Sequence, residues 1–119
     1  MLNAAGKKIL RDVHLGFARI HVLHHAAEEQ IFGLAMMEEL KRHGYDISPG
    51  TMYPLLHALE AAGTLVSTDK VVNGKIRKYY RTTKAGDALL RELRAKIHEL
   101  VEEVLDPRPH KTAQRRRNH

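Results

Sequence analysis

Apolar side chains recur three and four residues apart along much of the sequence, which is the spacing of one helix face. The first such stretch contains Ile9, Val13, Phe17, Ile20 and Leu23. A second helix is expected over residues 33–43, and Gly44 marks its end, because glycine readily adopts the conformation in which helices stop. Residues 1–8 lack the pattern and are expected to form a flexible N-terminal arm.

A third helix is predicted to begin after Ser48 and to end at Gly63. Ser48 is a favourable N-cap, and Pro49 follows at the first helical position, where its missing N–H costs nothing. The face expected to be buried contains Met52, Leu55, Leu56 and Leu59. The opposite face carries no carboxylate before Glu60 and no long side chain, so it is small, neutral and suited to a DNA groove.

Two β-like stretches, residues 65–72 and 76–82, flank Asn73-Gly74, a strong signal for a two-residue hairpin turn. The hairpin is rich in cations: Lys75, Arg77, Lys78, Arg81 and Lys84. Ile76 and one of the two adjacent tyrosines are expected to pack on the body of the domain, while the cations face outward near the tip.

The last helix is predicted over residues 84–105, with Thr83 as its cap. Its length of about 33 Å exceeds what a domain this small needs to cover its own core. Because its apolar stripe continues to the end, the far half needs a partner, and the first helix of a second subunit is the expected one. The predicted dimer interface consists of Val13, Phe17, Ile20, Leu90, Leu93, Ile97, Leu100 and Val104.

The order helix, helix, helix, hairpin, long helix predicts a mainly α fold with a small β-hairpin, namely a winged helix-turn-helix plus a long C-terminal dimerisation helix. The winged helix-turn-helix, with its N-terminal helix, spans residues 9–83, and the dimerisation helix spans residues 84–105. Residues 106–119 are expected to form a disordered basic tail.

The formal net charge of +6 is concentrated in two segments, residues 64–84 with +5 and residues 106–119 with +4. Such concentrated positive charge favours a polyanionic partner, and here double-stranded DNA. Tyr53 is expected to offer its hydroxyl to a phosphate, and Thr51 and His57 to reach base edges. The candidate DNA-binding residues are Ser48, Gly50, Thr51, Tyr53, Pro54, His57, Gly74, Lys75, Arg77, Lys78 and Arg81.

Three segments together resemble the PadR family of bacterial transcriptional regulators, and the resemblance covers roughly residues 15–105. The segments are "IFGLAMMEEL", "SPGTMYPLLHALEAAGTL" and "GKIRKYYRTTKAG". With one C-terminal helix, the chain resembles the compact branch of the family.

The resemblance implies a winged helix-turn-helix homodimer, of a kind that usually represses its target promoter and responds to a small-molecule effector. A two-fold dimer would place two recognition helices about one DNA turn apart, which predicts a near-palindromic operator. By motif position, Thr51, Tyr53 and Pro54 match the recognition-helix elements of the family. The wing elements are matched by Gly74, Lys75, Arg77 and Lys78.

An alternative function is that of a metal-responsive DNA-binding sensor. Nine histidines are present, and His21, His25 and Glu28 fall on one helical face, so that a zinc or nickel site could form there. No cysteine ligand and no HExxH motif accompany them. A metal site at these residues is therefore kept as an alternative hypothesis, and no resident cofactor is predicted.

Other functional classes fit the sequence less well. The absence of cysteine excludes disulfides and thiol chemistry, and no nucleophile–base pair or phosphate loop suggests an enzyme. A winged-helix module that binds protein is a further alternative, although such modules usually lack a cationic wing. No apolar run is long enough for a membrane span, so a cytoplasmic protein without membrane contact is expected.

Overall fold

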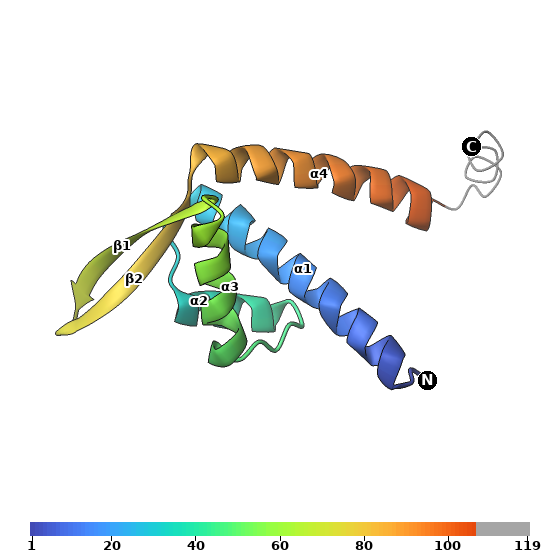
Figure 1. The fold of residues 1–119 in the computed structure, drawn as a ribbon, viewed down its shortest axis with the longest axis horizontal. Coiled ribbons are helices and arrows are strands. Elements are labelled where there is room, and N and C mark those ends of the chain that lie inside the picture. The colour runs from blue at the N-terminus through green and yellow to red at the C-terminus, as the bar shows by residue number, and fades with distance from the viewer. Residues whose placement is uncertain (107–119) are drawn as a thin grey trace.

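The computed structural model describes residues 1–106 of the 119-residue chain, and within them four helices accompany a two-stranded antiparallel hairpin (Figure 1). The helices are α1 (Ala4–Glu28), α2 (Gly33–Arg42), α3 (Pro49–Ala61) and α4 (Lys84–Leu105), and the strands are β1 (Leu65–Val72) and β2 (Lys75–Thr82). The predicted fold class, a winged helix-turn-helix with a long C-terminal helix, is therefore confirmed. Residues 107–119, which make up most of the predicted basic tail, lie outside the described residues.

The first helix begins earlier than its apolar pattern indicated. The predicted flexible arm over residues 1–8 is wrong for residues 4–8, which already belong to α1. The reason is Asn3, whose side-chain oxygen accepts a hydrogen bond of 2.8 Å from the Gly6 backbone N–H and caps the helix. A capping residue thus extends the helix over a turn that has little apolar patterning.

The hairpin forms with the predicted two-residue turn. Asn73 and Gly74 both have positive φ, 51° and 78°, which matches the backbone twist required between two antiparallel strands. The register pairs Val72 with Lys75 next to the turn and Leu65 with Thr82 at the base. Because Lys75 completes the pairing, β2 begins one residue earlier than expected.

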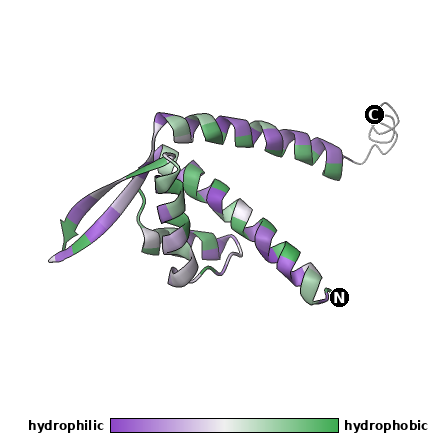
Figure 2. Cartoon of the chain, viewed as in Figure 1, coloured by the Kyte–Doolittle hydropathy of each residue, from purple (hydrophilic) through white to green (hydrophobic). Residues whose placement is uncertain are grey.

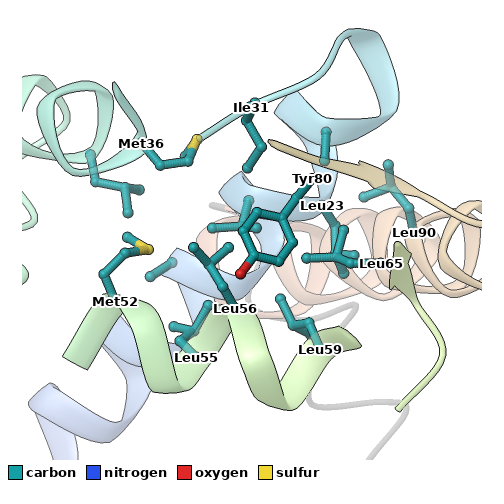
Figure 3. Close-up of a cluster of buried hydrophobic side chains, with 14 residues drawn as sticks. Leu23, Ile31, Met36, Met52, Leu55, Leu56, Leu59, Leu65, Tyr80 and Leu90 are labelled. Carbon is teal, nitrogen blue, oxygen red and sulfur yellow. The ribbon is translucent and has the colours of Figure 1, made fainter. Parts of the chain in front are cut away.

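One hydrophobic core joins all four helices to the base of the hairpin (Figure 3). The predicted inner face of α3 is fully part of it. The buried core residues are Ala18, Val22, Leu23, Ala26, Ile31, Met36, Leu40, Met52, Leu55, Leu56, Leu59, Leu65, Tyr80 and Leu90. Leu90 was expected at the dimer interface, but it is only 2% exposed because the first turns of α4 pack on the core of their own chain.

The far half of α4 extends away from this core, and α1 and α4 diverge along their length (Figure 1). Apolar residues nevertheless recur along both helices (Figure 2). On α4, Leu100, Val101, Val104 and Leu105 are all exposed. The single chain therefore leaves an apolar surface on its two longest helices uncovered.

Gly86 provides a test of the junction between α4 and the hairpin. A Cβ at this position would lie 2.1 Å from the Thr64 carbonyl oxygen, a backbone atom that cannot turn aside. We expect Gly86→Ala to lower the free energy of unfolding by about 1–3 kcal/mol in urea titrations. Gly50→Ala is the matched control, because its Cβ would approach only the Ser48 Oγ at 3.8 Å, and it should be neutral or gain up to about 1 kcal/mol. Equal stability of the two variants would contradict the packing described here.

Candidate nucleic-acid interface

The two helices of the helix-turn-helix begin without a side-chain cap. Phe32 precedes α2 and Ser48 precedes α3, and neither side chain makes a capping hydrogen bond within the described residues. By contrast, Asn3 and Thr83 cap α1 and α4 with their side chains. Ser48 is therefore the N-cap by position, as predicted, but its hydroxyl accepts no hydrogen bond from the first turn, and its carbonyl accepts from the Thr51 and Met52 N–H groups. The uncapped starts and the positive ends of the two helix dipoles suit an anion such as a phosphate.

The outer face of α3 is open to solvent. Gly50, Pro54 and His57 are exposed, and Thr51 is half-buried. Pro54 lies inside the helix without ending it, and the carbonyl that it leaves without an amide partner belongs to Gly50, near the exposed start of the helix. The predicted outward positions are therefore outward in the structure, with small or neutral side chains.

Tyr53 is the largest side chain on this face, with 41% of its surface exposed. Its ring lies against the start of α2, where a Cβ on Gly33 would be 2.6 Å from Tyr53 Cε1 and 3.0 Å from the hydroxyl oxygen. Gly33 thus makes room for the ring, which keeps the hydroxyl beside the uncapped first turn of α2. The tyrosine is neither sealed in the core nor free in solvent.

The hairpin is held to the helix-turn-helix through the segment between α1 and α2. Ile31 and Tyr80 form an antiparallel bridge, with the Ile31 N–H donating to the Tyr80 carbonyl at 2.9 Å and the Tyr80 N–H donating to the Ile31 carbonyl at 2.7 Å. The Tyr80 ring is buried in the core, as one of the two tyrosines was expected to be (Figure 3). Burial raises the pKa of its phenol above the usual value, and the nearby Glu60 carboxylate adds to this, so the ring stays neutral.

A second attachment involves Phe32 and the side chains of the strands. The Arg77 guanidinium carbon lies 4.2 Å from the Phe32 ring centre, and the Tyr79 ring meets Phe32 edge-on at 5.4 Å. Lys70 lies 4.9 Å from the centre of the Tyr79 ring and donates a 2.7 Å hydrogen bond to the Gln30 side chain. Cation–π and aromatic contacts of this kind fix the direction of the hairpin relative to α2.

A cleft of about 590 Å³ lies between the start of α2, α3 and the tip of the hairpin. Four of the predicted DNA-binding residues line it: Tyr53, Lys75, Arg77 and Lys78. Phe32, Gly33, Leu34, Val72, Asn73 and Ile76 complete its wall. Recognition-helix and wing residues predicted separately from the sequence therefore share one cationic recess.

Other expectations for the wing need correction. Ile76 was expected to pack on the body, but it is 75% exposed and lies opposite the equally exposed Val71 near the tip. Arg77 was expected to face outward, but it is half-buried because its guanidinium rests on Phe32. Arg81 is exposed but pairs with Val66 near the base of the hairpin and does not line the cleft. Gly74 is exposed at the turn.

The predicted metal-binding group of His21, His25 and Glu28 has different members in the structure. His21 and His25 lie together, but their third partner is His43 at the end of α2, whereas Glu28 groups with His24 and His25. Sequence reasoning missed His43, Phe32 and Gly33, since their partners are far along the chain. The local signal for this contact was Gly33 itself, which follows Ile31 and Phe32 and has no Cβ to collide with the Tyr53 ring.

Comparison with known proteins identifies the family. A model of the transcriptional regulator PadR-like family matches residues 22–92. The chain belongs to this family. It is 48% identical over 101 residues to the transcriptional regulator Rv3488 of Mycobacterium tuberculosis, covering 85% of this chain and 94% of that protein.

Solved structures of PadR proteins show the same fold. A PadR family transcriptional regulator from Eggerthella lenta DSM 2243 is 35% identical with a TM-score of 0.72, covering 85% of this chain and 92% of that one. A PadR-like regulator from Bacillus cereus is 27% identical with a TM-score of 0.64, covering 76% and 93%. This PadR-family protein is thus a DNA-binding transcriptional regulator, a class that is normally not enzymatic. Within residues 1–106, no helix has the length and apolar character needed to cross a membrane.

A double-mutant cycle tests the contact that fixes the wing. We expect Phe32→Leu and Arg77→Met to show a coupling energy of about 0.5–1 kcal/mol in urea unfolding, since each change removes the same cation–π contact. In the matched cycle, Lys78→Met replaces Arg77→Met. The coupling energy should then stay within about 0.5 kcal/mol, because the cation that lies over the Phe32 ring is Arg77 and not its neighbour Lys78, which is paired in register with Asp69. Equal coupling energies in the two cycles would show that Phe32 makes no specific cation–π contact with Arg77.

Proposed function

We propose that the protein is a homodimeric repressor that acts in the cytoplasm and binds a near-palindromic operator. In this proposal α3 enters the major groove while the β1–β2 hairpin lies along the adjacent phosphate backbone. The observation that carries the proposal is the shared cleft, in which Tyr53 of α3 lies beside Lys75, Arg77 and Lys78 of the wing.

The surface of α3 supports insertion into a groove. A major groove is about 12 Å wide, and a helix with glycine, proline and alanine outward can approach its floor closely. No carboxylate lies on this helix before Glu60. The Glu60 carboxylate already accepts two hydrogen bonds from Ser67, one from its hydroxyl at 2.5 Å and one from its N–H at 3.2 Å. The outer face therefore presents no strong repulsion to phosphates.

The wing supports contact with the backbone. Its two strands contain one acidic residue, Asp69, against several cations that gather toward the turn. A basic finger of this kind attracts phosphates through long-range electrostatics and releases counterions on binding. Val71 and Ile76, both exposed beside the turn, would add apolar contact with the groove wall.

The composition of the site also indicates the mode of recognition. Thr51 and His57 are the side chains on α3 suited to hydrogen bonds with base edges, and α3 has no arginine, asparagine or glutamine for a bidentate contact. We infer that phosphate contacts and DNA shape carry much of the recognition.

A dimer is favoured by the apolar surface that the chain leaves open. Val13, Phe17, Leu89 and Leu93 line an apolar groove of about 440 Å³ between α1 and α4, and the exposed stripe continues to the end of α4. The proposed interface residues are Val13, Phe17, Ile20, Leu93, Ile97, Leu100 and Val104, extended by Leu89 and Val101. Two-fold pairing through these helices would place two copies of α3 about one DNA turn apart.

A small-molecule effector is part of the same proposal. A second apolar pocket of about 340 Å³, lined by Phe17, Ile20, Tyr45 and Ile97 among others, opens between α1 and α4. This volume is at the lower end of the range typical of ligand pockets. Its place beside the dimer helices would let a ligand act on the distance between the two recognition helices.

Salt dependence of DNA binding tests the wing. Using a duplex from the region upstream of the gene, we expect the affinity measured by fluorescence anisotropy to fall steeply as salt rises. Lys78→Ala should weaken binding and lower the steepness of the log–log salt plot by about 1, as loss of one phosphate contact requires. Lys96→Ala is the matched control, since it removes the same charge from an exposed position on α4.

Tyr53→Ala should weaken binding in the same assay while the dimer stays intact. Tyr53→Phe, which removes only the hydroxyl, separates the phosphate contact from the packing on Gly33. Wild-type affinity in both Lys78→Ala and Tyr53→Ala would contradict the assigned face.

Leu100→Asp tests the dimer. It would bury a carboxylate in an apolar interface, at a cost of several kcal/mol, and should raise the dimer dissociation constant at least about 100-fold in sedimentation equilibrium. Ala95→Asp places the same carboxylate on the opposite side of α4 and should leave the dimer unchanged. A monomeric wild-type protein, or equal dissociation of the two variants, would refute the proposed interface.

A further inference from the structure

Three imidazoles from two helices meet where the C-terminal turns of α1 lie beside the end of α2. His21 and His25 are one turn apart on α1, and His43 is the C-terminal cap of α2. Each places a ring nitrogen within 4.8 Å of the others. The rings of His21 and His43 are nearly parallel, with their centres 4.9 Å apart.

A carboxylate completes the group. Glu39 Oε2 lies 2.9 Å from His43 Nε2 and 3.6 Å from His25 Nε2, and the Glu39 side chain is four-fifths buried. Its other oxygen, Oε1, is held by the guanidinium of Arg42. The arginine therefore orients the carboxylate and leaves Oε2 directed toward the imidazoles.

We propose that His21, His25 and His43, together with Glu39, form a binding site for a divalent transition metal of the zinc class. Imidazole nitrogens with a carboxylate oxygen are typical ligands for zinc, cobalt, nickel and copper. Zinc with bonds of about 2.0–2.1 Å holds tetrahedral ligand atoms about 3.4 Å apart. The three nitrogens lie within 4.8 Å of one another, so a further approach of about 1.4 Å would bring them to that separation.

The protonation state of the cluster is compatible with metal binding. Burial, followed by the neighbouring imidazoles His43 and His25, lowers the pKa of His21 below its usual value. Burial is also the main cause that lowers the pKa of His25. Both shifts favour the neutral imidazole, which is the form that coordinates a metal.

The position of the site gives the bound metal a structural consequence. His43 directly precedes the turn at Gly44 that leads toward α3, while His21 also lines the apolar pocket between α1 and α4. A metal bound here would hold the end of α2 to the C-terminal turns of α1. Because an unfolded chain lacks the preformed site, binding should raise the stability of the folded protein.

Metal titration of the full-length, chelator-treated protein tests this site. We expect one zinc ion per chain in competition with a chromogenic zinc chelator, and cobalt should give the visible absorption of a tetrahedral nitrogen–oxygen site. The melting temperature should rise with zinc. His43→Gln and His21→Gln should each lower the zinc affinity at least about 10-fold and reduce the shift in melting temperature.

Two controls carry the same type of change outside the cluster. His98→Gln alters an exposed histidine of α4, and the double variant His110→Gln with His119→Gln removes the histidines beyond the described residues. Both should bind zinc like the wild type. Circular dichroism without metal shows whether each variant is folded. If the His43→Gln variant is misfolded, the zinc affinity of the His21→Gln variant tests the site.

Two results would overturn the proposal. One is a wild-type protein that shows neither stoichiometric zinc binding nor a zinc-dependent melting temperature. The other is undiminished zinc affinity in His21→Gln and His43→Gln. Neither measurement uses DNA, so a failure of this site would leave the proposed operator binding untouched, and the reverse also holds.

Discussion

The short antiparallel bridge between Ile31 and Tyr80 determines whether wing and helix-turn-helix act as one body. Its two hydrogen bonds, 2.9 Å and 2.7 Å, join the segment before α2 to the second strand of the hairpin. The Tyr80 ring on the same residue is buried in the core. A two-stranded hairpin is only marginally stable alone, so this attachment is what gives the wing a fixed direction. Phe32, the next residue, adds its contacts with Arg77 and Tyr79 and keeps the basic strand beside α2.

That constraint explains why the cations converge. Arg77 cannot extend freely, because its guanidinium lies on Phe32, and Gly33 admits the Tyr53 ring one residue further along. Three consecutive residues at the start of α2, Ile31 to Gly33, thus position the hairpin, an arginine and the exposed tyrosine of α3. Phe32 and Gly33 form one wall of the cleft, the tip of the hairpin forms another, and α3 contributes Tyr53. Positive charge and the N-terminus of α2 meet there without a carboxylate among the residues that line it.

The sequence predicted those features that depend on nearby residues. Thr83 caps α4, and Asn73-Gly74 makes the turn with positive φ at both positions, because each signal acts within a few residues. The apolar spacing likewise identified the buried face of α3. Contacts between distant segments were not predictable in this way. Leu90 was assigned to a dimer surface although it fills the chain's own core, and His21 meets His43 only because α2 returns along α1. Periodicity shows which face is apolar, but not which partner covers it.

The two uses of α4 follow from its length. Its first turns bury Gly86 and Leu90 against the hairpin base and the core, so the helix direction is fixed where it begins. Beyond Ile97 the stripe is exposed at Leu100, Val101 and Val104, and Figure 1 shows that α4 diverges from α1 toward this end. A helix anchored at one end and apolar at the other can pair with a second subunit while keeping a set orientation to α3. In the proposed dimer, the spacing between the two recognition helices would be set by packing at the Gly86 junction as much as by the interface itself, and a ligand or metal that shifted α1 against α2 or α4 would act on that spacing.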